Sequence, residues 1–109
     1  PTAAMKSVTR LDHMRIIKGV IYNQKYNPNV FEGFEGLKKF TQLLRAYCSL
    51  GGFHVQFNVI SGDTLKDAQR NPEKYRGLVV RVAGYSAFFN ELSKEVQDII
   101  IARTEYDAI

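Results

Sequence analysis

The stretch that decides the fold is RVAGYSAFF, residues 81–89, inside the longer apolar run LVVRVAGYSAFF, residues 78–89. Gly84 stands near the centre of this run, where a glycine weakens a regular strand. A glycine in such a place marks a bulge or a tight turn, because only glycine adopts a positive φ there at little cost. On spacing alone, Gly84 is therefore a bulge or turn residue, and its apolar neighbours are ordinary core.

The sequence upstream of this run predicts helices and strands in one compact α+β unit. Apolar residues recur at helical spacing from Leu37 to Leu50, between a loop over residues 28–36 and the pair Gly51-Gly52. Phe53 to Val59 alternate apolar and polar residues, which predicts a strand with one polar face. Before the loop, we expect a helical turn within residues 10–18 and a strand from Gly19 to Tyr26.

Capping residues place the remaining elements. Thr64, with Asp67 three positions later, is expected to open a short helix that stops at Asn71-Pro72. Leu78 to Val82 is strand-like, and Ser93 is expected to cap a final helix.

Composition excludes several classes of protein. The chain has 109 residues, a net charge of +4 and one cysteine, so no internal disulfide can form. No apolar run approaches a membrane span and no signal peptide opens the chain, so we expect a cytoplasmic protein with no membrane partner. Single positive charges are scattered over residues 1–30, at Lys6, Arg10, Arg15, Lys18 and Lys25. They form no cluster, so we expect no nucleic-acid partner, although a non-catalytic basic binding module stays open as a remote alternative.

Conventional catalytic sites are missing from the sequence. His13 and His54 have no carboxylate cluster beside them, and His54 is interpreted as a hydrogen-bonded structural residue. Cys48 is interpreted as a small buried hydrophobic residue of its helix. Four carboxylates that could have formed an acid–base pair are interpreted as capping or surface charges: Asp63, Asp67, Glu91 and Glu95.

The chemistry of glycine offers a second interpretation of Gly84. Glycine has two hydrogens on Cα, and loss of one leaves a radical that can flatten between the electron-donating amide nitrogen and the electron-withdrawing carbonyl. A side chain would crowd that planar state. Such a radical needs protection from oxygen and water, which calls for a buried loop with apolar walls.

The motif RVAGY followed by SAFF closely resembles the C-terminal signature of the glycyl radical enzymes, the group that includes pyruvate formate-lyase. The resemblance extends over the whole chain, which is therefore interpreted as one glycine radical domain, residues 1–109. The segments that carry it, in the order of that family, are PTAAMKSVTRLDH (1–13), GGFHVQFNV (51–59), DTLKDAQRNPEKYRGLVVRVAGYSAFF (63–89) and EVQDIIIART (95–104).

The resemblance implies a site, a fold and partners. Gly84 would hold the stored radical, within a motif formed by Arg81, Val82, Ala83, Tyr85 and Ser86. The fold would be the C-terminal part of a ten-stranded α/β barrel, with the radical loop reaching into its middle. No cofactor would be bound by the chain itself. A separate activating enzyme, which uses S-adenosylmethionine and a [4Fe–4S] cluster, would install the radical. Because the Gly84 Cα must reach that enzyme, we expect residues 78–109 to detach as a unit.

The sequence departs from the family scheme at its cysteine. The substrate-attacking thiyl cysteine of the family lies on a distant loop, and AYCSLGG around Cys48 does not match it. We therefore expect that cysteine on the remainder of a longer parent enzyme, a homodimer acting on a small-molecule substrate. A bacterial microcompartment is the alternative to a free cytoplasmic location. The absence of an initiator methionine agrees with a C-terminal piece. The alternative is a stand-alone spare part that repairs an oxygen-cleaved pyruvate formate-lyase.

The residues after RVAGY also indicate a branch of the family. SAFF resembles the dehydratase and lyase branch, which includes glycerol dehydratase, choline trimethylamine-lyase and 4-hydroxyproline dehydratase. Arylacetate decarboxylases and arylalkylsuccinate synthases have similar tails and stay open.

Overall fold

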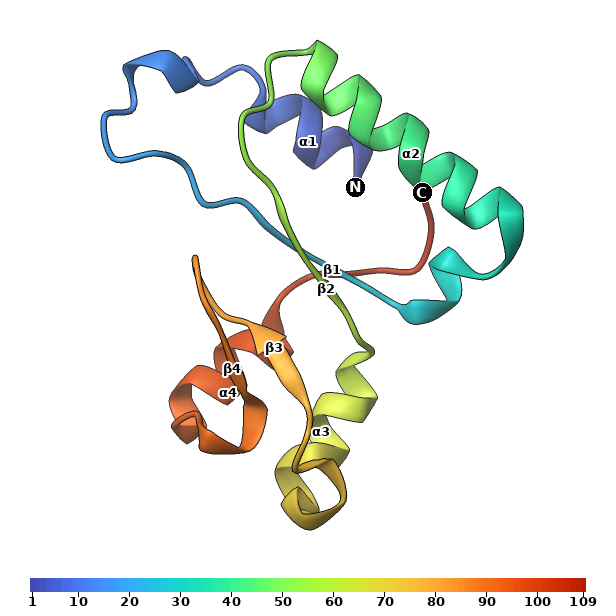
Figure 1. Cartoon of the computed structure of the whole chain (residues 1–109), viewed down its shortest axis with the longest axis vertical. Helices are drawn as coiled ribbons and strands as arrows, with labels where there is room; N and C mark the ends of the chain where they lie inside the picture. Colours follow the sequence, from blue (N-terminus) through green and yellow to red (C-terminus); the bar gives the residue numbers. More distant parts are fainter.

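The computed structural model describes all residues from Pro1 to Ile109 and has the predicted α+β composition (Figure 1). Its helices are α1 (Thr2–Val8), α2 (Gly33–Ser49), α3 (Gly62–Arg70) and α4 (Lys94–Ala102). Its strands are β1 (Asn23–Tyr26), β2 (Gln56–Val59), β3 (Val79–Arg81), β4 (Ser86–Phe88) and β5 (Glu105–Tyr106). Short 3₁₀ turns occupy His13–Arg15, Pro28–Phe31, Pro72–Tyr75 and Phe89–Glu91. None of the helices combines the length and the apolarity that crossing a bilayer requires.

Two separate β-structures organise the chain. Strands β2, β1 and β5 form a parallel sheet with β1 in the middle, and β3 and β4 form an antiparallel hairpin. In the sheet register, Asn23 lies opposite Gln56 and Lys25 opposite both Asn58 and Glu105. Because side chains at alternate positions share one face, these residues form a single polar face of the sheet.

The opposite face of the sheet is aromatic and is covered by α1 and α2. We call the sheet with these two helices the sheet region. Its buried core consists of Met5, Tyr26, Leu43 and Tyr47, with Phe57 and Tyr106 packed against it. The aromatic rings pack edge-on or tilted around Tyr26, whose ring centroid lies 5.3 Å from that of Tyr106.

The hairpin, α3 and α4 form a second core, which we call the hairpin region. Six buried residues make it: Leu65, Ala68, Val80, Val82, Phe89 and Ile100. Figure 1 shows this region on the other side of β1 and β2 from α2. The polar face of the sheet therefore lies between two apolar cores.

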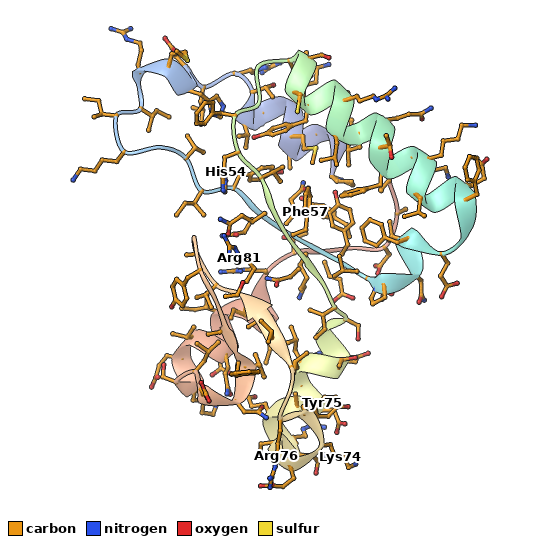
Figure 2. All side chains as sticks on the ribbon, in the orientation of Figure 1. His54, Phe57, Lys74, Tyr75, Arg76 and Arg81 are labelled. Atoms are coloured by element: carbon orange, nitrogen blue, oxygen red, sulfur yellow. The ribbon has the colours of Figure 1, made fainter.

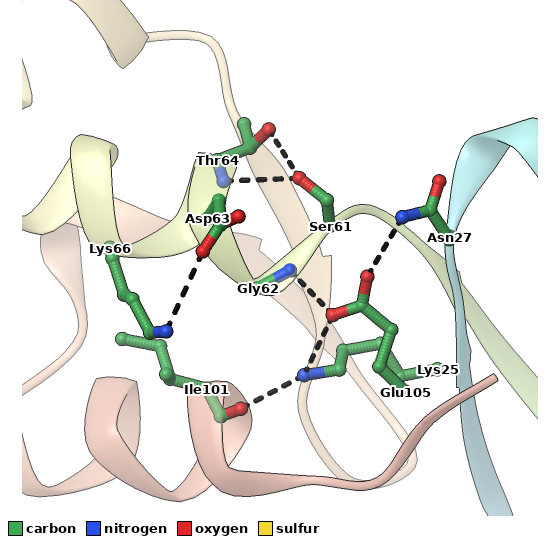
Figure 3. A network of polar contacts seen from close by, with 9 residues as sticks. All are labelled: Lys25, Asn27, Ser61, Gly62, Asp63, Thr64, Lys66, Ile101 and Glu105. Carbon is green, nitrogen blue, oxygen red and sulfur yellow. Dashed lines mark hydrogen bonds and ion pairs between the residues drawn. The ribbon is translucent and has the colours of Figure 1, made fainter. Parts of the chain in front are cut away.

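A buried ion pair fastens the hairpin region to the sheet (Figure 3). Lys25 is 2% exposed, and its Nζ donates to the carbonyl of Ile101 at 2.9 Å and lies 3.6 Å from Glu105 Oε2. The same carboxylate accepts from the backbone N–H of Gly62 at 2.6 Å and from Asn27 Nδ2 at 3.1 Å. A cation at the C-terminus of α4 and an anion at the N-terminus of α3 both complement the helix dipoles. Lys25 is therefore unavailable to a basic binding surface, contrary to that alternative.

Helix starts differ from the sequence predictions in two places. The cap of α3 is Ser61, not Thr64: Ser61 Oγ accepts from the Thr64 N–H at 3.1 Å. Helix α2 begins at Gly33, inside the predicted loop, and therefore includes Gly36. Residue 36 has to be a glycine, because a Cβ there would collide with the carbonyl oxygen of Val30. The predicted cap of the final helix is confirmed, since Ser93 Oγ accepts from Val96 N–H.

The first segment also differs from expectation. Helix α1 had no counterpart in the sequence predictions, and the first strand is limited to Asn23–Tyr26. Residues 78–109 are joined to the rest of the chain by β5, which pairs with β1, and by α3, which shares the core of the hairpin region. Their detachment as a unit would have to break these contacts, and it stays a prediction.

Candidate functional site

Gly84 lies at the tip of the β3–β4 hairpin. Arg81 pairs with Ser86, and the Val82 N–H donates to the Tyr85 carbonyl at 2.9 Å, which leaves Ala83 and Gly84 as the turn. Gly84 has a φ of +78°, a conformation that glycine adopts without strain. The interpretation of Gly84 as a turn residue is therefore confirmed.

The hairpin tip is exposed within this chain. Ala83, Gly84, Tyr85 and Ser86 are all exposed, whereas Val82 is buried in the hairpin region. A Cβ built on Gly84 would meet only Ile21 Cδ1 at 3.5 Å, an ordinary van der Waals distance. The expectation of a buried loop with apolar walls is thus not met by the residues of this chain.

Asn58 joins β2 to the hairpin through a side-chain amide. Its Oδ1 accepts from the Arg81 N–H at 2.7 Å, and its Nδ2 donates to the Arg81 carbonyl at 2.8 Å. The amide thereby pairs with both backbone groups of Arg81, as a neighbouring strand would. Because Asn58 is 7% exposed, both bonds are sheltered from water.

Arg103 also holds this backbone. Its Nη1 donates to the Arg81 carbonyl at 3.0 Å, and its Nη2 donates to the Val82 carbonyl at 2.7 Å. Burial lowers the pKa of Arg103, although arginine remains protonated in proteins. The ion pairs of the chain include neither Arg81 nor Arg103, so the base of the hairpin carries net positive charge.

Gln56 reaches Gly84 itself. Its Oε1 accepts from Arg81 Nε at 3.0 Å and from the Gly84 N–H at 3.3 Å, and its Nε2 lies 3.1 Å from His54 Nε2. Figure 2 shows Arg81 reaching from the hairpin toward the segment before β2 that carries His54. At the other end of Arg81, Nη1 donates to Ser86 Oγ at 3.2 Å.

The structure brings some predicted site residues together and separates others. Arg81, Val82 and Ser86 make hydrogen bonds around Gly84, whereas the Ala83 and Tyr85 side chains have no polar partner. The residues that anchor the hairpin from outside it, namely Asn23, Gln56, Asn58 and Arg103, were not predicted as site residues. The alternation in FHVQFNV was the available signal, because it gave β2 a polar face.

The isolated histidines and the cysteine have structural surroundings. His13 Nε2 bonds to the Val8 carbonyl at 3.0 Å, and His54 bonds to Gln56, as expected for a structural histidine. Cys48 is exposed on α2, so its interpretation as a buried residue is wrong. The helix turns Tyr47 and Leu43 inward instead, which rotates Cys48 to the outer face. No three His, Cys, Asp or Glu side chains gather in a way that could hold a metal ion.

Comparison with known proteins identifies relatives along the whole chain. The family described as "Glycine radical" matches residues 1–90. An indoleacetate decarboxylase from Tractidigestivibacter scatoligenes is 48% identical over 109 residues, which are 100% of this chain and 12% of the relative. A trans-4-hydroxy-L-proline dehydratase from Clostridioides difficile is 48% identical over 105 residues, 96% of this chain and 13% of the relative.

The fold is also found in a solved structure. The glycerol-bound form of the B12-independent glycerol dehydratase from Clostridium butyricum superposes with a TM-score of 0.94 and 52% sequence identity, over 98% of this chain and 14% of that one. The chain therefore spans about an eighth of the length of the relatives that it matches.

Proposed function

Because this chain belongs to the glycine radical family and corresponds to the glycyl radical region of larger enzymes, we propose that Gly84 is the residue that stores the radical. The observation that carries the proposal is the placement of Gly84. It is the only glycine of the RVAGY motif, and it lies at the tip of a hairpin whose base is anchored by hydrogen bonds from the sheet. Of the hairpin residues, glycine alone lacks the side chain that would oppose a planar Cα radical.

The proposed chemistry starts with a hydrogen-atom transfer. A 5′-deoxyadenosyl radical, generated from S-adenosylmethionine by the [4Fe–4S] cluster of an activating enzyme, removes one Cα hydrogen from Gly84 and becomes 5′-deoxyadenosine. Gly84 then takes a hydrogen atom from the thiol of a cysteine outside this chain, which leaves a thiyl radical to attack the substrate. When the product is released, the sulfur recovers its hydrogen from Gly84, and the glycyl radical is restored.

The residues of this chain supply position rather than substrate contacts. Asn58 and Arg103 hold the backbone of Arg81 and Val82, and Val82 is buried in the hairpin region, so the two strands are fixed while the tip projects. Gly84 is thereby presented on a short rigid hairpin, as transfer of a hydrogen atom over van der Waals distance requires. Positive charge from Arg81 and Arg103 lies behind it, at the base.

We assign the complete enzyme to the lyases of this family, acting on a small molecule by dehydration, decarboxylation or a related bond cleavage. The relatives described above include two dehydratases and a decarboxylase. In this proposal the residues that select the substrate belong to the rest of the enzyme, because the hairpin tip has no polar side chain other than Tyr85 and Ser86 to contact one.

Electron paramagnetic resonance tests the assignment to Gly84. After anaerobic incubation with a matching activating enzyme and S-adenosylmethionine, the complete enzyme should show the doublet of a Cα radical, and Gly84→Ala should show none. Gly51→Ala is the control for the backbone strain that an alanine causes at a positive φ, since Gly51 has a φ of +87° and open space around it. Both variants should lose about 1 kcal/mol of stability, but only Gly84→Ala should lose the radical. A doublet in activated Gly84→Ala would reject the proposal.

Exposure to air gives a second measurement of the same assignment. Oxygen should cleave the activated chain at Gly84 and release the segment Tyr85–Ile109, which has 25 residues (109 − 84). Mass spectrometry should find that fragment in the wild type and in Gly51→Ala, and not in Gly84→Ala. Cleavage at another glycine would place the radical elsewhere.

A further inference from the structure

Gln56 is the one side chain of the sheet that reaches the backbone of Gly84. It lies on the polar face of β2, is 8% exposed, and accepts two hydrogen bonds at a single oxygen, from Arg81 Nε at 3.0 Å and from Gly84 N–H at 3.3 Å. We propose that Gln56 is a positioning residue for the radical: it holds the Gly84 amide and adjusts the electron density of its nitrogen. This inference rests on the proposed function of Gly84.

The orientation of the Gln56 amide follows from its neighbours. Two N–H donors converge on one end of the amide, so that end is the oxygen. The other end is then the NH₂ group, which donates to His54 Nε2 at 3.1 Å. In this arrangement His54 Nε2 is the acceptor. Both ends of the Gln56 amide are therefore fixed. If the amide flipped, its NH₂ group would face the N–H donors of Arg81 and Gly84.

The hydrogen bond acts on the nitrogen that a Cα radical uses. A glycyl radical is stabilised by electron density donated from its amide nitrogen, and an acceptor on the N–H increases that density. At 3.3 Å the bond is slightly longer than an ordinary N–H···O bond. The Gln56 side chain is flexible, so the hydrogen bond from the Gly84 N–H to Gln56 Oε1 can shorten as the Gly84 Cα becomes planar.

A comparison with Asn58 distinguishes the proposed role of Gln56 from a purely structural one. Asn58 lies two positions from Gln56 on the same face and makes both backbone bonds to Arg81, which hold the hairpin on the sheet. The hydrogen bonds of Gln56 to the hairpin go only to the Arg81 side chain and the Gly84 N–H. Removing its oxygen should therefore change the tip while the base stays in place.

The chemistry of Gln56 can be dissected with two variants. Gln56→Met keeps nearly the same volume but has no strong acceptor for Arg81 and Gly84. Gln56→Glu keeps the acceptor for both donors and loses the donor to His54. The proposal therefore expects Gln56→Glu to restore what Gln56→Met removes.

Amide hydrogen exchange in the unactivated complete enzyme tests the contact without any radical. In the wild type, the Gly84 amide should exchange at least tenfold more slowly than the neighbouring Ala83 amide, after correction for intrinsic rates, since Ala83 N–H has no partner. Gln56→Met should remove this protection, and Gln56→Glu should keep it within about threefold. Equal exchange of Ala83 and Gly84 in the wild type would overturn the proposal, even if a variant fails to fold.

Two properties of the radical, its coupling to the Gly84 N–H proton and its lifetime, should depend on Gln56 only if Gln56 acts on the radical. A purely structural role would leave both unchanged. In activated enzyme, electron–nuclear double resonance in H₂O and D₂O should measure the coupling of the exchangeable Gly84 N–H proton. Gln56→Met should change that coupling and shorten the anaerobic lifetime of the radical severalfold, and Gln56→Glu should restore both toward the wild type. If the wild type forms no radical, the proposed function fails. If it forms one whose coupling and lifetime are the same in Gln56→Met, the role of Gln56 is rejected while the proposed function stands.

Discussion

The sheet region and the hairpin region fill their interiors differently. In the sheet region, aromatic rings surround Tyr26, and only four apolar residues are buried. In the hairpin region, five small or aliphatic residues together with Phe89 form the core, and Leu65, Phe89 and Ile100 are 0% exposed. The hairpin region therefore closes its own core, although it is built from fewer residues.

The sheet region, by contrast, leaves apolar surface open. A groove of about 320 Å³ lies between α1 and α2, lined mainly by apolar residues that include Met5, Leu43 and Leu50. The chain has a radius of gyration of 15.1 Å, against about 13 Å for a compact domain of this size. The part carrying Gly84 thus has a closed core of its own, whereas the part that holds it in place leaves an apolar groove open.

Matched leucines should reveal the difference between the two cores most strongly. Leu65 is 0% exposed in the hairpin region, whereas Leu43 is 8% exposed beside the open groove of the sheet region. Leu65→Ala should cost about 4 kcal/mol and Leu43→Ala about 2 kcal/mol, because a cavity beside a groove is already partly open to water. Urea unfolding of the chain measures both. Equal losses would mean that the two cores are equally closed.

The next largest loss of stability is expected at the buried ion pair of Lys25 and Glu105, which connects the two regions. Lys25→Met should cost about 3 kcal/mol, because it leaves the Ile101 carbonyl and the Glu105 carboxylate without their buried cation. The control is Lys66→Met. Lys66 also lies 3.6 Å from its partner Asp63, but the two side chains are 55% and 96% exposed, so the loss should stay below about 0.5 kcal/mol. Similar losses at Lys25 and Lys66 would show that the buried pair does not join the regions.

The difference between the regions also explains what the sequence could predict. Elements that depend on local signals were predicted: the turn at Gly84, the cap at Ser93 and the amphipathic part of α2. The start of α3 was misplaced because Ser61 and Thr64 are both good caps three residues apart, and their hydroxyls bond to each other. The helix α1 has only seven residues and no side-chain cap, so no local signal marked it.

The site was predicted only where it is local. Gly84 and its motif are contiguous, but their anchors come from other elements: Asn58 lies 23 residues from Arg81, and Arg103 lies 22. Alternation in β2 indicated a polar face, and such a face usually meets water. Here it meets backbone groups of the hairpin, because Asn58 and Gln56 offer amides that satisfy them away from solvent. That contact depends on the tertiary fold.

A smaller effect is expected where Arg103 holds the hairpin. Arg103→Lys should lower the free energy of opening of the hairpin by about 1 kcal/mol, because an ammonium group cannot span the two carbonyls of Arg81 and Val82. Hydrogen exchange of the Val82 amide, which bonds across the hairpin turn, measures this opening. The control Arg76→Lys changes an exposed arginine and should leave that exchange unchanged. If both variants behave alike, the forked contact of Arg103 does not hold the hairpin.

The smallest effects should come from pH, and acid and alkali should act on different regions. In the hairpin region, hydrogen bonds from Tyr75 and Asn71 lower the pKa of Asp67, and those from Gln69 and Lys94 lower the pKa of Asp98. A carboxyl whose pKa is lower in the folded state stabilises the fold above its ordinary pKa of 3.8, and this stabilisation is lost as the pH falls further. Acid below about pH 4 should therefore loosen the hairpin region first.

Alkali should loosen the sheet region instead. Burial raises the pKa of Tyr22, Tyr26 and Tyr47 above the ordinary 10.0. A phenol whose pKa is raised by folding stabilises the fold fully below its unfolded pKa, and this contribution is lost as the pH rises past it. The hairpin region has one such phenol, Tyr75, whose pKa is raised by its hydrogen bond to Asp67. Hydrogen exchange at a series of pH values, corrected for intrinsic rates, should show β1 opening before β3 above about pH 10 and the reverse order below pH 4. The same order at both extremes would mean that the two regions open as one cooperative unit, despite their separate cores.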